Sequence, residues 1–533
     1  MASSATPEAS PEPAWSETSC PFRLPSPERE GDTYVCGTIQ VPLDHTNPSG
    51  PSIELTFARL FATRPETDAD PVLWLEGGPG ASALAVAATN RLITESVRAT
   101  RDVILLDQRG AGYSGYLECG SYQSAATTGS IAEGTPFPET PAPDASVAEV
   151  FNYARATAAL GFEACRDGYA EEGLDLRFFT TEAIAQDSML LLDALGYSQA
   201  TLWGTSYGGR IATVIMRDFP ERVRAAVLDS PLPLGIRRLE TFATLETEPA
   251  GNLFAWCTAD DACRATYPDL QERALALIAV LDADPIPLDP EVAFRSGLTD
   301  GFSGAGVVRL LTAVLSGNPD TAGAIPRAIV DLESGDATLA LAILAGSLDT
   351  PEREIPPTLT ETSFAPLLQA TDARLALSLA MRTAVLCNDE AGVTLADLAR
   401  EEENGPVSPL RGVVPFRSAI TLYAQCRAID TGAEPLDRTE PTAQIPVLVL
   451  GGSYDGTTAP SWAEQAANAL PSAQFVLVPG AGHATARWSG CARDLIAGFI
   501  VEPSESIDQS CLAGEHPALL LPDAPLPITE PAR

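Results

Sequence analysis

Short apolar runs that end in glycine-rich loops recur along the chain and constrain its fold more than any other feature. Among them are "PVLWLEGGPG", "RDVILLDQRGAG", "ATLWGTSYGG", "VRAAVLDSPLPLG", "IPVLVLGGSYDG" and "AQFVLVPGAG". Each apolar run suits a strand that is buried on both faces. Segments with helical spacing lie between them, such as the one that runs from an N-cap at Thr181 to Gly196. This alternation predicts an α/β protein with a mostly parallel sheet and helices on both of its faces.

One of these runs leads into a candidate nucleophile, Ser206. The serine lies between Gly204 and Gly208, after an apolar run and before a segment with apolar residues at helical spacing. A sharp turn between a strand and a helix can expose a nucleophilic serine, and its strained backbone tolerates only small neighbours. The pattern therefore predicts that Ser206 is a nucleophile at such a turn. The alternative is a plain structural turn.

A nucleophilic serine needs a base, and the chain has three histidines. His45 falls in a turn, and His516 falls in a proline-rich C-terminal tail. His483 follows the apolar run "FVLVP" in the loop "GAGH". Because sites form at the carboxyl ends of parallel strands, His483 is the predicted base for Ser206.

The base in turn needs a carboxylate to orient it. Asp229 and Asp455 both follow apolar runs late in the chain, and either strand end could carry the acid. Asp455 lies in a glycine loop and precedes His483 by one helix and one strand. We favour Asp455, because the order Ser206, Asp455, His483 is the order found in α/β-hydrolases.

An oxyanion intermediate needs backbone N–H donors. One donor is expected from Tyr207, the residue after the nucleophile. The second is expected from a glycine loop after an early strand, and "EGGPG" provides Gly78. The alternative is that this loop is only a turn that ends a strand.

The strand pattern stops at about residue 236 and resumes only near residue 445. The intervening region is rich in alanine and leucine, resembles helix, and is punctuated by proline. An insertion of this size between strands of one sheet predicts a mainly helical cap domain over the site. The predicted organisation is a flexible leader (1–30), the first core part (31–235), the cap (236–440), the second core part (441–515) and a tail (516–533).

The charge of the chain excludes several functions. It has 71 acidic and 33 basic residues, a net charge of −38, and every basic residue is arginine. Without lysine there is no Schiff base, no Ser-Lys dyad and no P-loop lysine. A polyanionic surface repels nucleic acid and anionic membranes, so we expect neither as a partner.

Ten cysteines favour disulfides and an oxidising compartment, with buried free thiols as the alternative. Neither a Cys-x-x-Cys pair nor a zinc-like Cys/His cluster occurs in the sequence, so we expect no metal. No apolar run is long enough to span a membrane. The sequence begins with a Pro/Ser/Glu-rich stretch instead of a signal peptide, and we expect an exported protein whose signal is missing here.

These stretches together resemble the proline iminopeptidase and tripeptidyl aminopeptidase family of α/β-hydrolase serine peptidases. The resemblance rests on "GGPG", "LLDQRGAGYS", "GTSYGGR", "GGSYDGTT" and "GAGH", in that order. The long insertion, the cysteines and "SYGG" are more similar to the tripeptidyl aminopeptidase branch. The resemblance implies that Ser206, Asp455 and His483 form the triad, and that Gly78 and Tyr207 form the oxyanion hole.

The same resemblance implies roles for other residues. Asp107 and Arg109 of "DQRG" match the family motif, in a supporting or a direct role. Glu76 stands where proline iminopeptidases have histidine, which counts against a strict proline iminopeptidase. An aminopeptidase must also pair the ammonium group of its substrate with a carboxylate. Asp389 and Glu390 are weak candidates for this carboxylate, and the alternative is that both are solvated acids at the end of a helix.

The expected function is therefore a serine exopeptidase, without a cofactor, that cleaves short peptides from a free N-terminus. We expect it to be a monomer. A carboxylesterase or amidase with the same triad is the main alternative, and a non-catalytic binding protein is a further one. Dehalogenase or epoxide hydrolase chemistry would require an aspartate in place of Ser206.

Overall fold

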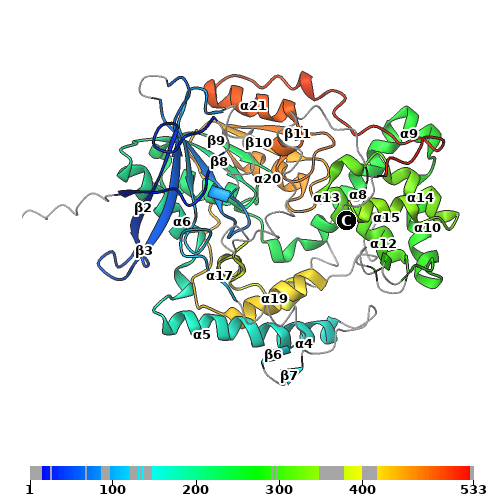
Figure 1. Ribbon diagram of the computed structural model, residues 1–533, viewed down its shortest axis with the longest axis horizontal. Coiled ribbons are helices and arrows are strands. Elements are labelled where there is room, and N and C mark those ends of the chain that lie inside the picture. The colour runs from blue at the N-terminus through cyan, green and yellow to red at the C-terminus, as the bar shows by residue number, and fades with distance from the viewer. Residues whose placement is uncertain are drawn as a thin grey trace, which may run out of the picture.

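The structure is a computed structural model of the 533-residue chain. It describes residues 15–24, 27–65, 69–85, 97–119, 130–132, 135–136, 147–289, 292–293, 298, 301–346, 348, 377–398 and 417–528. Within these residues the strands and helices alternate along much of the chain (Figure 1).

A nine-stranded sheet forms the centre of the described structure, in the order β1-β2-β3-β5-β4-β8-β9-β10-β11. From β5 to β11 the paired strands are parallel, whereas β1, β2 and β3 are antiparallel. The predicted mostly parallel sheet is therefore confirmed. The strands are β1 (Trp15–Thr18), β2 (Tyr34–Pro42), β3 (Ser52–Leu60), β4 (Val72–Leu75), β5 (Val103–Leu106), β8 (Ala200–Thr205), β9 (Val223–Asp229), β10 (Val447–Gly452) and β11 (Ala473–Val478).

Strands β4, β5, β8, β9 and β10 are buried on both faces, as the continuous apolar runs predicted, whereas the same prediction was wrong for β11, where Leu477 is exposed at the edge of the sheet. In β4, Leu73 and Leu75 belong to one core cluster, and Val72 and Trp74 belong to another, because successive side chains point to opposite faces. The first cluster includes side chains of α6 (Thr181–Ala194), α7 (Tyr207–Asp218), α17 (Leu379–Asp389) and α20 (Pro460–Ala469), and the second includes α21 (Gly490–Val501). The helices thus form a layer on each side of the sheet (Figure 1).

A helical region interrupts the sheet between β9 and β10. The two strands pair directly, with Val447 opposite Ala226, although more than two hundred residues separate them. Helices α8 to α15 of this region have a core cluster of their own, and in Figure 1 they lie apart from the sheet. The predicted cap boundaries at 236 and 440 remain predictions. The helices are α8 (Phe242–Ala259), α9 (Asp261–Thr266), α10 (Leu270–Ala283), α12 (Gly304–Arg309), α13 (Leu315–Gly317), α14 (Ile325–Glu333), α15 (Thr338–Leu344), α17, and α19 (Arg417–Ile429).

The remaining elements precede the candidate nucleophile. Helix α4 packs against α19, so the helical region between β9 and β10 also contacts a segment that precedes β8 (Figure 1). Helix α6 has Thr180 as its N-cap, whose side chain accepts from the N–H of Ala183. The prediction of Thr181 as the cap was wrong by one residue, because the Thr181 hydroxyl is used elsewhere. These elements are β6 (Ser130–Ala132), β7 (Thr135–Pro136), α4 (Val147–Ala158) and α5 (Ala164–Glu171).

The described segments near both ends of the chain pack against the rest of the protein. Strand β1 lies within the predicted flexible leader, yet it pairs with β2, and the Cys20–Cys36 disulfide ties the segment to that strand. The leader prediction was therefore wrong for residues 15–18, and residues 1–14 lie outside the described residues. In the tail, the N–H of Leu520 donates to the carbonyl of Gly323, so the tail packs on the helical region.

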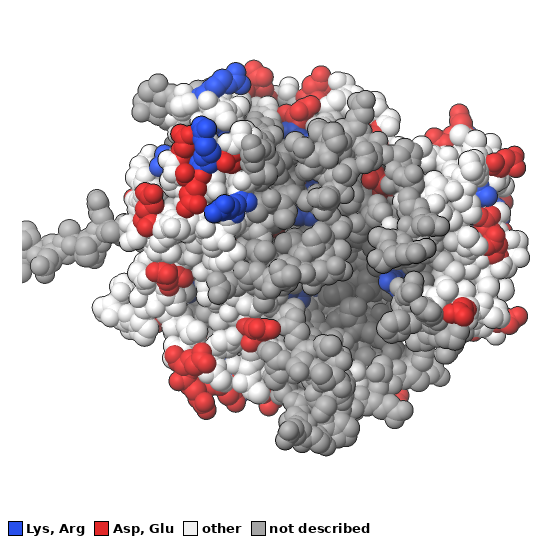
Figure 2. Space-filling model, viewed as in Figure 1, with Lys and Arg blue, Asp and Glu red and all other residues white. Residues whose placement is uncertain are grey.

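All ten cysteines form disulfides. The pairs are Cys20–Cys36, Cys119–Cys165, Cys257–Cys263, Cys387–Cys426 and Cys491–Cys511. The alternative of free thiols is therefore wrong. Within the described ranges, no helix is long and apolar enough to cross a membrane. Acidic side chains are spread over the outer parts of the face shown in Figure 2, as the net charge leads one to expect.

Candidate active site

Ser206 lies at the turn between β8 and α7, in a conformation that is rare for residues other than glycine. Its φ is 59° and its ψ is −123°. Two close backbone approaches hold this turn. A Cβ on Gly204 would lie 2.4 Å from the carbonyl oxygen of Gly208, and a Cβ on Gly208 would lie 1.9 Å from that of Leu75. Both glycines are therefore needed for the strained strand–turn–helix geometry that the sequence predicted at Ser206.

His483 and Asp455 come together from the ends of β11 and β10. The Nδ1 of His483 lies 2.8 Å from Oδ2 of Asp455. Asp455 is fully buried and also accepts from the N–H groups of Thr457 and Thr458, at 2.8 and 2.9 Å. These donors fix the carboxylate, and the carboxylate fixes one ring nitrogen of the histidine. Among the described residues, no hydrogen bond uses the other ring nitrogen, Nε2.

Asp229, the rival acid, supports the loop that follows the histidine. Its Oδ1 accepts from the N–H and hydroxyl of Thr485, at 2.8 and 2.7 Å, and its Oδ2 accepts from the N–H of Ala486 at 3.2 Å. Burial raises the pKa of the Asp229 carboxyl. The imidazole of His483 is hydrogen-bonded to Asp455, so Asp229 acts on the position of the loop.

The glycine loop after β4 lies directly against the nucleophile turn. A Cβ on Gly77 would lie 2.7 Å from Cβ of Ser206. The N–H of Gly77 donates to Oε1 of its neighbour Glu76, whereas among the described residues no acceptor takes the N–H of Gly78 or of Tyr207. Tyr207 is the first residue of α7, where a backbone N–H has no partner within the helix. Both predicted oxyanion donors are thus free to bind a ligand.

Glu76, which replaces the histidine of proline iminopeptidases, is buried and satisfied. Its Oε2 accepts from Nε1 of Trp74 at 2.8 Å, and its Oε1 accepts from the N–H of Gly77 at 3.0 Å. The carboxylate therefore holds the glycine loop and does not act as a free base.

Asp107 and Arg109 of "DQRG" are buried and hydrogen-bonded to other residues of the protein. Asp107 accepts from the Ser82 hydroxyl and from the N–H groups of Leu84 and Tyr113. Arg109 is fully buried and binds Asp187 through Nε and NH2, at 2.8 and 2.7 Å. These contacts lie within the protein, so the structure gives this pair a supporting role.

Asp107 also makes the stability of the fold depend on pH. Burial raises the pKa of its carboxyl to about 6 from 3.8, although hydrogen bonds to Tyr113 and Leu84 oppose the shift. Between about pH 4 and 6 the folded chain holds a proton that the unfolded chain has lost. The contribution of this proton to the free energy of unfolding is fully present below about pH 4 and is lost as the pH rises through about 6. The free energy of unfolding of the wild type, relative to Asp107→Asn, should therefore fall by roughly 2 kcal/mol from pH 4 to 7 in denaturant titrations. A constant difference between the two proteins would contradict this pKa.

Asp389 and Glu390, the weak candidates for binding an ammonium group, are both buried and already face arginines. Asp389 accepts from NH1 of Arg210 at 3.0 Å and from the hydroxyl of Thr181. Glu390 Oε1 accepts from NH2 of Arg438 at 3.2 Å, whereas its Oε2 has no hydrogen-bond partner. An ammonium group would meet guanidinium groups at either carboxylate, so the alternative of solvated acids is wrong and neither acid suits an amine.

Asp389 also connects to the nucleophile turn. The hydroxyl of Thr181, which contacts Asp389, lies 2.8 Å from the hydroxyl of Tyr207. Burial raises the pKa of the Tyr207 hydroxyl well above its usual value, so the side chain stays neutral. The buried network of Arg210, Asp389, Thr181 and Tyr207 therefore links α7, which begins directly after Ser206, to α6 and α17.

Thr458 is a site residue that sequence reasoning missed. Its hydroxyl lies 2.9 Å from Oδ2 of Asp455, 3.2 Å from Nδ1 of His483 and 2.8 Å from the carbonyl of Ser230. The only signal in the sequence is a second threonine in "YDGTT", three residues after the acid.

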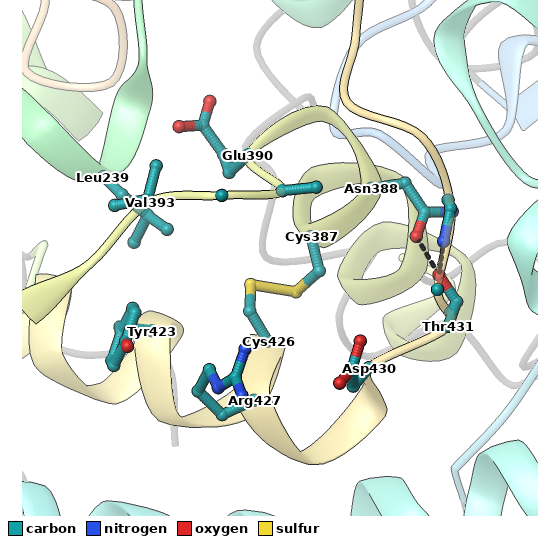
Figure 3. A pocket seen from close by; sticks show the side chains of 14 residues that line it. Leu239, Cys387, Asn388, Glu390, Val393, Tyr423, Cys426, Arg427, Asp430 and Thr431 are labelled. Carbon is teal, nitrogen blue, oxygen red and sulfur yellow. Dashed lines mark hydrogen bonds between the residues drawn. A yellow bond between two sulfur atoms is a disulfide. The ribbon is translucent and has the colours of Figure 1, made fainter.

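A cavity of about 80 Å³ lies between α17 and α19, around the Cys387–Cys426 disulfide. Figure 3 shows Leu239, Val393 and Tyr423 at one end and Thr431 beside Asn388 at the other. The cavity lining does not include Ser206 or His483. Within the described residues no group of acidic, histidine and cysteine side chains could hold a metal ion.

Comparisons with known proteins match two parts of the chain to α/β-hydrolase families. Residues 70–281 match the family described as alpha/beta hydrolase fold, and residues 415–511 match the family described as TAP-like protein. The tripeptidyl aminopeptidase of Streptomyces lividans is 26% identical over 284 residues, which are 51% of this chain and 49% of that protein. The serine protease Hip1 of Mycobacterium tuberculosis H37Rv is 26% identical over 240 residues, 43% of this chain and 42% of that protein.

The chain thus spans about half the length of the curated relatives it matches. Among solved structures, a proline iminopeptidase of Mycobacterium smegmatis matches with 17% identity and a TM-score of 0.37, over 87% of this chain and 98% of that one.

Proposed function

Because the chain is an α/β hydrolase related to the tripeptidyl aminopeptidases, we propose that it is a serine exopeptidase that removes short peptides from a free N-terminus. The observation that carries this proposal is Ser206 at a strained turn, with the buried Asp455 hydrogen-bonded to the partly exposed His483 at the same edge of the sheet. The named relatives, a tripeptidyl aminopeptidase and a serine protease, support peptides as the substrate class.

In the proposed reaction, His483 takes the proton of the Ser206 hydroxyl while Oγ attacks the scissile carbonyl. Asp455 holds Nδ1 of the imidazole and stabilises its positive charge. The N–H groups of Gly78 and Tyr207 donate to the oxyanion. His483 then gives the proton to the leaving amine, and water releases the acyl group from Ser206 by the same steps in reverse.

We also infer that the protein works outside the reducing cytoplasm. Five disulfides support this compartment, since disulfides persist in oxidising surroundings. A monomeric state stays a prediction.

A carboxylesterase or amidase remains a second candidate because of one observation. Asp389 and Glu390, the two carboxylates proposed for an ammonium group, already face guanidinium groups. An esterase or amidase with the same triad would need no ammonium partner.

The requirement for a free amine separates the two candidates. We expect the wild type to release intact tripeptide from Ala-Ala-Pro-anilide and to cleave the N-acetylated anilide at least about tenfold more slowly. Acetylation removes the positive charge of the substrate amine. The loss of one charged hydrogen bond to that amine costs about 1.4 kcal/mol or more of binding free energy, which is about tenfold. Liberated aniline and the released peptide are measured together by absorbance and mass spectrometry. Equal cleavage of both anilides would sink the exopeptidase proposal, and rapid turnover of simple esters alone would favour the esterase.

A further inference from the structure

The N-terminus of α17 lies beside the glycine loop of the candidate active site. The N–H of Ser378 donates to the carbonyl of Gly80 at 2.9 Å. A Cβ on Gly80 would lie 3.4 Å from the backbone nitrogen of Arg382, and a Cβ on Gly78 would lie 3.0 Å from Cδ1 of Leu377. The first turn of α17, which carries Arg382, therefore packs on the loop that supplies Gly78.

Arg382 differs from the neighbouring arginines in having no partner. Arg210 binds Asp389, Arg438 binds Glu390, and NH1 of Arg238 donates to the carbonyl of Thr457 at 3.0 Å. Within the described part of the chain, the guanidinium of Arg382 makes no ion pair and no hydrogen bond, although its side chain is only partly exposed. A guanidinium withdrawn from water without a partner carries a desolvation cost that a bound anion would offset.

The charge of Arg382 also acts on a neighbouring arginine, Arg238. The positive charge of Arg382, after burial itself, is the strongest influence that lowers the pKa of Arg238, to about 10. Arg238 in turn contacts Thr457, whose N–H donates to Asp455. Burial alone lowers the pKa of Arg382, and no acidic group opposes it. The helix turn that packs on the Gly78 loop thus carries a positive charge that no carboxylate of the described residues neutralises.

We propose that Arg382 is a specificity residue that binds a carboxylate of the substrate. A planar guanidinium with free donors matches a carboxylate with two hydrogen bonds, whereas a neutral amide offers only one acceptor. The inference rests on the proposed function, because it assumes that the substrate is a peptide. The carboxylate could be an acidic side chain near the cleaved bond or the C-terminal carboxylate of a short peptide.

Two pairs of peptides distinguish these sources. Ala-Ala-Glu-anilide is compared with Ala-Ala-Gln-anilide, and Ala-Ala-Pro-Ala with a free C-terminal acid is compared with its amide. We expect kcat/KM of the wild type to favour the charged member of one pair by about tenfold or more. Arg382→Gln should bring that ratio close to one, and Arg382→Lys should keep part of it. Arg264→Gln, which removes an exposed arginine far along the cap, should leave the ratio unchanged.

Binding measurements keep the two claims separate. The same peptides are titrated calorimetrically into full-length Ser206→Ala, with and without Arg382→Gln, after a thermal melt has shown that each variant is folded. If Ser206→Ala binds the charged peptides more tightly but the wild type cleaves no peptide, the exopeptidase proposal is overturned and the carboxylate site still stands. Turnover of peptides with a ratio near one in both pairs, or a ratio that Arg382→Gln does not change, would overturn the role of Arg382.

Discussion

Ser206→Ala is expected to lower kcat/KM for any ester or peptide anilide by about 10⁴-fold or more. The covalent step is lost, and only binding and the oxyanion donors remain to accelerate the reaction. The fold should survive, because the turn is held by backbone contacts. The N–H of Ser206 donates to the carbonyl of Asp229 at 3.0 Å, and the carbonyl of Ser206 accepts from Leu232 at 2.9 Å. Initial rates and the thermal unfolding midpoint measure the two effects.

The control is Ser188→Ala, which removes a buried serine of α6 that hydrogen-bonds only within its helix, to the carbonyl of Ile184. This variant should keep its activity within a few fold. A Ser206→Ala protein that keeps more than about one-hundredth of the wild-type activity would show that another group is the nucleophile.

The second large effect is expected for Arg210→Ala, which should lower the free energy of unfolding by about 3 to 5 kcal/mol. Arg210 is fully buried, and its loss leaves Asp389 in the interior without its cation. The carbonyls of Pro233 and Ile236 also lose a donor, at 3.1 Å for the first. The shift of the denaturant midpoint measures the change.

Two further variants serve as controls for Arg210→Ala. Arg166→Ala removes a surface ion pair between the partly exposed Arg166 and the exposed Asp167 and should cost no more than about 1 kcal/mol. The double change Arg210→Met and Asp389→Leu should be less destabilising than Arg210→Ala alone, because no charge is left buried. Equal losses for Arg210→Ala and Arg166→Ala would mean that the buried pair does not hold α17 to α7.

The sequence was sufficient for the sheet because the determinants of its strands are local, whereas the candidate triad stays a prediction. A short apolar run specifies a buried strand, and its last residues specify what stands at the edge of the sheet. The glycines around Ser206 are similarly explained by backbone contacts within a few residues and one neighbouring strand.

Other features depend on pairings that no local pattern specifies. Asp389 and Glu390 follow a cysteine in a helical segment, and only the tertiary structure shows that arginines from other segments face them. The same applies to Thr458, whose hydroxyl meets His483 from a different strand end. Strand β1 could not be predicted from its Pro/Ser/Glu-rich sequence. It forms by pairing with the edge of β2, and the Cys20–Cys36 disulfide holds the segment to that strand.

The most direct test of the account is covalent labelling with a fluorophosphonate, followed by peptide mapping. The account predicts one adduct per chain, on Ser206, that is absent in Ser206→Ala and forms much more slowly in His483→Ala. An adduct on another residue, or labelling that persists in Ser206→Ala, would contradict the assignment of Ser206 as the nucleophile.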